Sequence, residues 1–240
     1  MELYYAAATE NNLVHLDNEE SHHCIKVMRH RIGDLLTVTD GRGSKFSATI
    51  LNDDRQACVL QKVQILQNVT KGNVGLHLAI APTKNIDRFE WLLEKATEIG
   101  IDEITPIITH RAERTHIKME RLQKLLISAM KQSLRCWLPQ LHEPVLFDHF
   151  INMEGKDATQ NAAALKTICH CQRHDLPLLK QICMHKQEVL ILVGPEGDFT
   201  MEEIALAESN GCIASSLGEA RLRTETAGLI ALHTVHLLND

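Results

Sequence analysis

Two stretches near the end of the chain decide its fold: Leu192-Val193-Gly194-Pro195-Glu196-Gly197-Asp198-Phe199-Thr200 and Ser216-Leu217-Gly218-Glu219-Ala220-Arg221-Leu222-Arg223-Thr224-Glu225-Thr226-Ala227-Gly228. In each, a short apolar run breaks into a glycine-bearing loop and then into a helical pattern. Such strand-loop-helix corners are typical of open α/β sheets, which bind ligands at the carboxyl ends of their strands. The sequence therefore predicts two backbone loops side by side at one edge of a parallel sheet.

Neither loop has the form of a common nucleotide or nucleophile loop. The chain has no G-x-G-x-x-G after a strand, no P-loop and no G-x-S-x-G elbow. Gly194 and Gly197 permit close approach of the backbone to a ligand, and Thr200 is predicted to cap a helix whose free N–H groups point toward the loop. A tight strand-helix turn would explain one such loop, but a second one at 218–223 favours a ligand site.

Upstream of these loops, strands alternate with helices. Strands are predicted at Val74–Ala81, Glu103–Thr109, Ala162–Cys169, Glu188–Val193 and Cys212–Leu217. Helices are predicted from a capping box at Asp87–Glu90 to Gly100, over Lys118–Arg135, from a capping box at Thr200 to Gly211, and over Thr224–Leu238. This alternation predicts a mostly parallel α/β sheet. The stretch 138–160 gives no clear prediction.

The first 70 or so residues have a different pattern. Short alternating runs at Leu35–Asp40, Lys45–Leu51 and Ala57–Leu66 predict strands, the first two as a hairpin around Gly41–Ser44, and a helix is predicted at Ser21–Arg29. Strands at this spacing suggest a small barrel. The polar stretch Gln67–Asn73 marks the boundary, so we predict a β-rich domain at 1–72 and an α/β domain at 73–240.

Composition places the chain among ordinary globular proteins. Its 240 residues are 44% hydrophobic and 23% charged. No apolar run approaches the ~18 residues needed to span a bilayer, and the N-terminus lacks signal-peptide features. We therefore expect a cytoplasmic protein without membrane association, in which the seven cysteines are reduced thiols.

Charge argues against a protein that coats nucleic acid nonspecifically, because the net charge is −6. One segment, from His110 to Cys136, is strongly basic. It contains Arg111, Arg114, Lys118, Arg121, Lys124, Lys131 and Arg135 against only Glu113 and Glu120. A solvated helix face and a nucleic-acid footprint are both open interpretations of this segment.

Several cysteines and histidines suggest a metal site at first sight. They are Cys169, Cys171, His174, Cys183 and His185, but their spacing matches no strong zinc pattern, so we expect no metal. His22, His23 and His30 are interpreted as packing or solvent residues. The basic residues beside them, Lys26, Arg29 and Arg31, are placed to meet phosphate.

Arg221, Arg223 and Glu225 form the remaining candidate group. Arg223 directly precedes the last predicted helix, and Glu225 lies in its first turn, where the helix dipole favours a carboxylate. From the charge pattern alone, the group is either part of a site or a helix-end ion pair of little energetic worth.

These residues together give the chain a clear resemblance over nearly its whole length. It resembles the E-type ribosomal RNA methyltransferase family of the knotted SPOUT superfamily, whose members methylate uridine N3 in small-subunit rRNA. The resemblance is carried by His22–Arg29, Gly33-Asp34, Asp40–Gly43, Lys95–Ile104, Pro106, Arg111, Gln132-Ser133, Arg135 and, most specifically, Gly194–Gly197 and Leu222–Ala227.

The resemblance implies a fold and a reaction. The fold would be an N-terminal PUA-like RNA-binding β-barrel at 1–72 and a C-terminal SPOUT α/β domain at 73–240 with a deep trefoil knot. The reaction would be methyl transfer from S-adenosylmethionine to uridine N3 in 16S rRNA of the small ribosomal subunit. The resemblance also implies a homodimer with cofactor pockets at or near the subunit interface.

The resemblance further implies site residues. The cofactor would be bound by Leu192, Val193, Gly194, Pro195, Glu196, Gly197, Ser216, Leu217, Gly218, Leu222 and Thr226, and RNA by Lys26, Arg29, Arg42, Arg111, Arg114, Arg135 and Arg221. Arg223 is the candidate cation that stabilises a deprotonated uracil, and Glu225 is a weaker candidate for the base.

The chain departs from the family pattern at two positions. Asp198 stands where the family usually has a second glycine, and Ala220 stands where it usually has an arginine, with Arg221 one position later. These departures leave two alternatives open. One is a knotted methyltransferase that acts on a ribose 2′-OH or on tRNA, and the other is a non-catalytic RNA-binding assembly factor.

Overall fold

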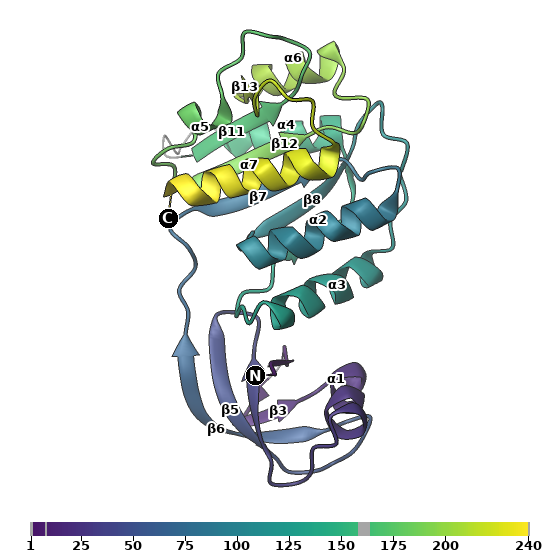
Figure 1. The fold of residues 1–240 in the computed structure, drawn as a ribbon, viewed down its shortest axis with the longest axis vertical. Helices are drawn as coiled ribbons and strands as arrows, with labels where there is room; N and C mark the ends of the chain where they lie inside the picture. The colour runs from purple at the N-terminus through teal and green to yellow at the C-terminus, as the bar shows by residue number, and fades with distance from the viewer. Residues whose placement is uncertain (1, 8, 158–163, 240) are drawn as a thin grey trace. The chain divides into compact units, whose positions relative to one another are not determined.

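The computed structural model describes residues 2–7, 9–157 and 164–239, with the side chains of 154–157 left out (Figure 1). The chain forms two compact units. Unit 1 consists of Met1–Lys71 and Ile127–Leu138, and unit 2 consists of Gly72–Leu126 and Pro139–Asp240.

Unit 1 is built on a six-stranded sheet. Its strands are β1 (Tyr4–Tyr5), β2 (Thr9–Glu10), β3 (Leu13–His15), β4 (Leu35–Thr39), β5 (Ser44–Ile50) and β6 (Val59–Asn68), in the order β1-β4-β5-β6-β3-β2. The predicted β4–β5 hairpin is confirmed. Within the described residues the hydrogen-bonded path ends at β2 without returning to β1, so the sheet is a half-barrel rather than a closed barrel.

The helical segment of unit 1 differs from the prediction of one helix over 21–29. A short helix α1 (Asn18–His22) runs directly into a π-helical turn η1 (His23–Val27). The helix begins earlier because Asp17 is its N-cap and accepts a hydrogen bond from the Glu20 N–H at 2.8 Å. Ser21 serves the core instead: its hydroxyl accepts from the Cys58 N–H at 2.9 Å.

Unit 2 contains the predicted parallel sheet. Its strands are β7 (Gly75–Ile80), β8 (Glu103–Ile108), β9 (Gln140–Leu141), β10 (Val145–Leu146), β11 (Ala164–Cys169), β12 (Glu188–Val193) and β13 (Ile213–Ser215). The order is β10-β8-β7-β12-β11-β13, with β9 also paired to β8, and every pairing is parallel. Of the predicted strand at 162–169, Ala164–Cys169 form β11, and residues 162 and 163 lie outside the described residues.

Helices cover both faces of this sheet. They are α2 (Ile86–Ile99), α4 (Phe147–Asp157), α5 (Leu179–Ile182), α6 (Met201–Ser209) and α7 (Thr224–Asn239), whereas α3 (Met119–Gln132) is divided between the two units. α2 and α7 pack together on one face, and α4 and α6 pack on the other (Figure 1). None of the described helices is long and apolar enough to cross a membrane.

The ends of these helices test two predicted capping boxes. The box at Thr200 is confirmed: its hydroxyl accepts from the Glu203 N–H at 3.2 Å, and the Glu203 carboxylate accepts from the Thr200 N–H at 2.8 Å. The box at Asp87 is wrong, because Asn85 caps α2 by accepting from the Asp87 N–H at 3.0 Å. Gly100 ends α2 at a φ of 110°, as predicted for a glycine C-cap.

Candidate functional site

Three neighbouring strands of unit 2 end at the same level. Cys169 at the end of β11 pairs with Val193 at the end of β12 on one side and with Ser215 at the end of β13 on the other. The loops that follow therefore begin side by side at the carboxyl edge of the sheet, where open α/β sheets bind ligands. The two predicted loops are brought together, and the loop after β11 joins them.

These loops enclose a cavity of about 340 Å³. Of the predicted residues, it is lined by Val193, Gly194, Pro195, Glu196, Ser216, Leu217, Gly218, Arg221, Leu222 and Arg223. Its other lining residues are Cys169, His170, Cys171, Asp198, Ala220, Thr224 and Ala227. Leu192, Gly197, Glu225 and Thr226, which the sequence also suggested, do not line it.

Asp198 joins two of the three loops. Its carboxylate accepts hydrogen bonds from the Cys171 N–H at 2.9 Å and the Phe199 N–H at 2.8 Å, and the Gln172 amide donates to it at 3.4 Å. Its backbone adopts a φ of 62°, which Asp tolerates better than most residues. Asp198 thus adopts the backbone conformation typical of glycine, and its carboxylate clamps the two loops together, which a glycine could not do.

The β13 loop depends on a glycine. Gly218 has a φ of 122°, and a Cβ placed there would meet no heavy atom within 4 Å. The Ser216 hydroxyl braces the turn because it accepts from the Gly218 N–H and donates to the Gly218 carbonyl, both at 3.1 Å. The backbone at Gly218 is therefore strained for other residues and open to a ligand.

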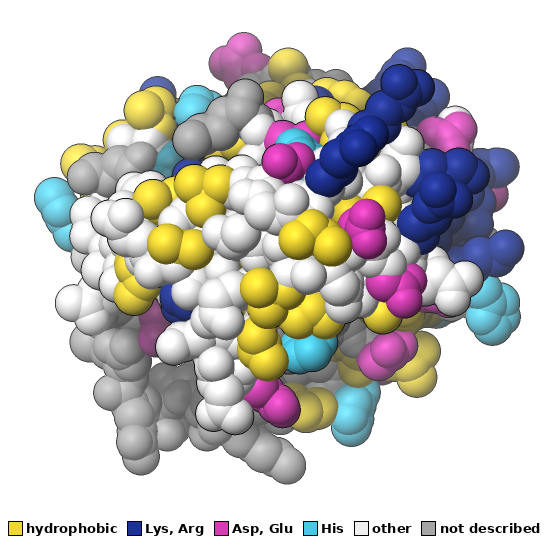
Figure 2. All heavy atoms as spheres, turned by 90° about the horizontal axis from the view of Figure 1, so that it is seen from below, with side chains coloured by type: hydrophobic (Ala, Val, Ile, Leu, Met, Phe, Trp, Pro, Cys, Tyr) yellow, Lys and Arg dark blue, Asp and Glu magenta, His cyan; other side chains and the backbone are white. Residues whose placement is uncertain are grey.

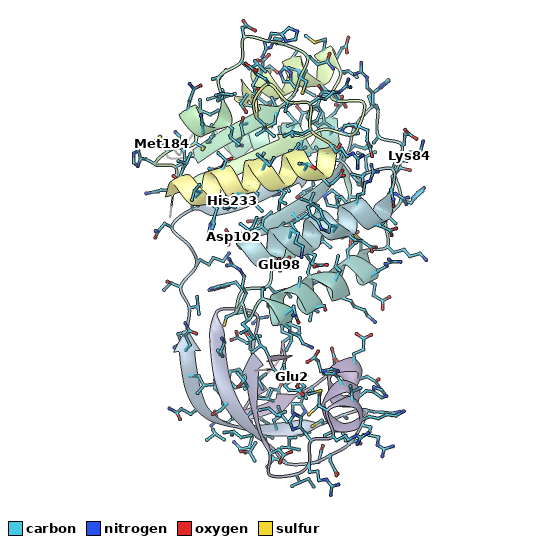
Figure 3. All side chains as sticks on the ribbon, viewed as in Figure 1. Glu2, Lys84, Glu98, Asp102, Met184 and His233 are labelled. Carbon is cyan, nitrogen blue, oxygen red and sulfur yellow. The ribbon has the colours of Figure 1, made fainter. Side chains whose placement is uncertain are left out.

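Arg111 and Arg114, predicted to contact RNA, hold backbone carbonyls. Arg111 donates to the Gly197 carbonyl at 2.8 Å and the Phe199 carbonyl at 3.3 Å. Arg114 donates to the Lys84 carbonyl at 2.7 Å. Lys84, labelled in Figure 3, in turn donates its N–H to the Glu196 carboxylate at 3.0 Å. These contacts brace the 194–200 loop from outside the cavity.

Arg223 and Glu225 lie in different surroundings although they are two residues apart. Arg223 is exposed and lines the cavity. Glu225 is buried, with one carboxylate oxygen 3.8 Å from Arg88 Nε on α2 and the other without a hydrogen-bond partner. The structure thus brings Arg223 to the cavity and directs Glu225 toward α2.

His170 is a buried histidine that lines the cavity, and no motif or spacing in the sequence singled it out. Burial lowers its pKa below the usual 6.5, so the ring is neutral at neutral pH. Its Nδ1 accepts from the Gln172 N–H at 3.1 Å, which leaves the proton on Nε2. That Nε2 is buried and has no partner.

Cys171 and Arg221 both line the cavity. Burial raises the pKa of the Cys171 thiol, and the guanidinium of Arg221 opposes that rise. Cys171 is exposed, whereas Cys169 and Cys183 are buried. Within the described part of the chain, the five cysteines and histidines first considered for zinc do not converge on a common centre.

The other predicted RNA contacts lie in unit 1. Lys26, Arg29 and Arg42 are exposed, and Arg135 is half-buried. Figure 2 shows Lys and Arg side chains gathered on one side of the face in view, with hydrophobic side chains spread across its centre. Lys131 of the basic segment instead forms an ion pair with the buried Glu20.

Comparisons with known proteins agree with this architecture. A model of an RNA methyltransferase domain matches residues 70–236, and a model of an RNA methyltransferase PUA domain matches residues 16–63. A Synechocystis protein named ribosomal RNA small subunit methyltransferase E is 32% identical, over 94% of this chain and 73% of its own. A Rickettsia conorii protein of the same name is 31% identical, over 96% of this chain and 92% of its own.

Solved structures give the same result. A probable rRNA methyltransferase from Porphyromonas gingivalis is 38% identical, with a TM-score of 0.88 over 100% of this chain and 98% of its own. A putative methyltransferase from Legionella pneumophila, solved with bound S-adenosylmethionine, is 28% identical, with a TM-score of 0.85 over 99% and 97%.

The fold, the cavity at the sheet edge and these matches define an RNA methyltransferase with an N-terminal PUA domain. Within that class, the chain belongs to the ribosomal RNA small subunit methyltransferase E family. The family membership predicted from the sequence is confirmed.

Proposed function

We propose that this protein transfers a methyl group from S-adenosylmethionine to N3 of a uridine in 16S rRNA. The observation that carries the proposal is the cavity where β11, β12 and β13 end, with Arg223 on its wall. The names of the relatives support small-subunit rRNA as the substrate, and the Legionella structure supports the cofactor.

The residues around the cavity fit S-adenosylmethionine. A volume of about 340 Å³ lies within the range of small-molecule sites, and Leu217 and Leu222 offer apolar surface. The open backbone at Gly218 and the unpartnered Nε2–H of His170 offer polar contacts. We assign cofactor binding to Val193–Glu196, Ser216–Gly218 and Leu222. We assign Leu192, Gly197 and Thr226 a supporting role, in which they position the neighbouring residues that line the cavity.

The cofactor, when bound, supplies an electrophilic methyl group, so the protein must orient the base and make N3 nucleophilic. Uridine N3 carries a proton at neutral pH and gains a free electron pair only when that proton leaves. Negative charge then spreads over N3 and O4. Arg223 is exposed on the cavity wall, where its guanidinium can stabilise that charge.

Glu225 is less suited to contact the uracil. It is buried against Arg88 and does not line the cavity, so we assign it a positioning role at the start of α7. Arg223 is then the one residue of the pair that we propose as catalytic. The proton on N3 would leave to solvent or to a group of the RNA complex.

RNA must present an unpaired or splayed-out base, because Watson–Crick pairing hides N3. We assign phosphate contacts to Lys26, Arg29, Arg42, Arg135 and Arg221. Arg111 and Arg114 have a second role in bracing the cofactor loop, which accounts for their contacts with backbone carbonyls. The homodimer and the trefoil knot stay predictions of the family resemblance.

The test is to incubate the protein with radiolabelled S-adenosylmethionine and small ribosomal subunits that lack the modification, then to digest the rRNA and identify the labelled nucleoside. Label in 3-methyluridine is the expected result. Label in another nucleoside or in tRNA would keep the cofactor and overturn the specificity. Subunit binding without label would favour a non-catalytic assembly factor.

A further inference from the structure

Three side chains with metal-binding atoms converge in unit 2, outside the cofactor cavity. They are His77 on β7, Glu103 on β8 and His142 just after β9, and one ligand atom from each lies within 4.8 Å of the others. No other group of this kind occurs within the described ranges of the chain. All three residues are half-buried.

The register of the sheet explains why they meet. His77 pairs directly with Glu103 across β7 and β8, and Glu103 pairs with Gln140 across β8 and β9. His142 follows Gln140 by two residues and therefore faces the same side of the sheet. Its N–H donates to the Ile104 carbonyl at 2.9 Å, which extends the pairing to this residue.

Asp102, labelled in Figure 3, fixes this register. Its carboxylate accepts from the Leu76 N–H at 2.9 Å, and its carbonyl accepts from the Gln140 N–H at 2.8 Å. Asp102, which directly precedes Glu103, thus connects the start of β8 to both β7 and β9. The three side chains are held by backbone pairing rather than by a flexible loop.

Their local contacts match the needs of a metal site. His142 Nε2 lies 2.8 Å from the Glu103 carboxylate, and His77 Nε2 lies 2.8 Å from the Thr105 hydroxyl. A histidine ring has two nitrogens, so one nitrogen of His77 can bind an ion while Thr105 stays an outer partner that orients the ring. Phe150 packs edge-on against His77 at 5.8 Å between ring centroids and shields this side.

We propose that His77, Glu103 and His142 bind a divalent cation of the zinc class, with water completing the coordination. Two imidazoles and one carboxylate are a donor set that zinc uses. Bonds of about 2.1 Å place tetrahedral ligand atoms roughly 3.4 Å apart. The present separations of up to 4.8 Å exceed this spacing by little more than 1 Å, so binding in this proposal draws the three side chains together.

The site has a structural role in this proposal. None of its three residues lines the cofactor cavity. β9 has two residues, and among the described strands it pairs with β8 alone, so its ladder is short. An ion shared by three segments would tie the chain around β9 to β7 and β8, because an ion that binds only the folded state stabilises it.

The experiment uses the full-length protein, stripped of metal with a chelator and desalted. Zn²⁺ affinity is measured by competition with a chromophoric chelator, and thermal unfolding is followed with and without Zn²⁺. Co²⁺ absorption then reports the ligands. We expect one ion per chain, a higher Tm with Zn²⁺, and a Co²⁺ spectrum without sulfur-to-cobalt charge-transfer bands.

Variants locate the ion. H142A and E103Q are expected to weaken Zn²⁺ binding at least about tenfold, the lower range seen even for outer partners of metal ligands. E103Q keeps a hydrogen-bonding side chain of similar size opposite His142. It therefore tests the site even if the H142A variant does not fold. H149A is the matched control, because His149 is an exposed histidine of the same unit outside the group. It should bind Zn²⁺ as the unaltered chain does.

Three results would overturn the proposal. They are no stoichiometric Zn²⁺ binding, unchanged binding in both H142A and E103Q, or thiolate bands in the Co²⁺ spectrum that assign the ion to cysteines. Methyltransferase activity is not needed for any of these measurements, so failure of the metal proposal is distinguishable from failure of the proposed function.

Discussion

Asp198 illustrates how single residues set the geometry of this site. The family usually has a glycine at this position, and the φ of 62° explains why glycine is suited to it. Here a carboxylate occupies the position and accepts hydrogen bonds from two loops. The sequence identified the departure, but only the structure shows that the side chain connects the β11 and β12 loops.

We expect D198A to weaken binding of S-adenosylmethionine about tenfold, because charge-assisted hydrogen bonds to two loops are lost. D198N keeps one acceptor oxygen and tolerates positive φ, so it should lose less. Isothermal titration of the cofactor measures both. Equal affinities for all three proteins would show that the clamp does not organise the cavity.

Arg223 and Arg221 are expected to act on different kinetic constants. R223A should lower kcat about 100-fold or more, the usual effect of removing a group that stabilises transition-state charge. R221A should mainly raise KM for the ribosomal subunit, because we assign it to phosphate contact. Steady-state kinetics with purified subunits separates the two. Near-normal kcat in R223A would remove Arg223 from the catalytic role.

His170 gives a pH dependence of stability with a definite sign. Its folded-state pKa lies below 6.5, so the unfolded chain takes up a proton first as the pH falls. Its contribution to stability is fully present above pH 6.5 and is lost as the pH falls toward the lowered pKa.

The variant H170N isolates this effect, because the other histidines stay unchanged. Urea denaturation from neutral to acidic pH should show a shallower loss of stability in H170N than in the unaltered chain. Parallel curves for the two proteins would contradict a buried neutral His170.

At the scale of elements, caps and register place the functional loops. α6 starts at the residue after Thr200, where the 194–200 loop ends, and its capping box fixes that start. The sequence predicted this box and the bounds of β12 correctly, because both are local signals. It placed the start of α2 wrongly, because Asn85 and Asp87 are both good cap residues and only the path of the chain chooses between them.

We expect T200A to destabilise the protein by about 1 kcal/mol, the typical loss for an N-cap hydroxyl. T200S retains a hydroxyl and should stay within a few tenths of the original value. Chemical denaturation measures both. If T200A and T200S were equally stable, the hydrogen bond from the Glu203 N–H to the Thr200 hydroxyl would not contribute to the stability of the protein.

Across the whole molecule, the chain returns to unit 1 after leaving it. Ile127–Leu138, which includes the end of α3, belongs to unit 1 by its contacts. There the Trp137 ring donates its N–H to the Val69 carbonyl at 2.9 Å. A Cβ on Gly43 would lie 2.6 Å from both the Trp137 ring and the Val69 carbonyl oxygen.

This packing makes G43A and G33A an informative pair. Both glycines have positive φ, 99° and 93°, but a Cβ on Gly33 would meet no heavy atom within 4 Å. G33A should cost only backbone strain, about 1 kcal/mol, whereas G43A should cost at least about 2 kcal/mol because it must also displace Trp137 or the backbone. Thermal denaturation compares them. Equal losses would mean that the returning segment is not tightly packed on Gly43.

The sequence by itself determined the fold class, the order of most strands and helices, the family and the two glycine-bearing loops. These features follow from local signals, namely periodicity, caps, turns and short motifs. Each such signal is formed by residues that are close together in the sequence. The tertiary structure decided which side chains meet. Packing directed Arg223 to the cavity and Glu225 to α2, bound Arg111 to the Gly197 carbonyl, and brought His77, Glu103 and His142 together. Strand register and helix packing bring together residues that are far apart in the chain. Local sequence patterns do not predict such contacts.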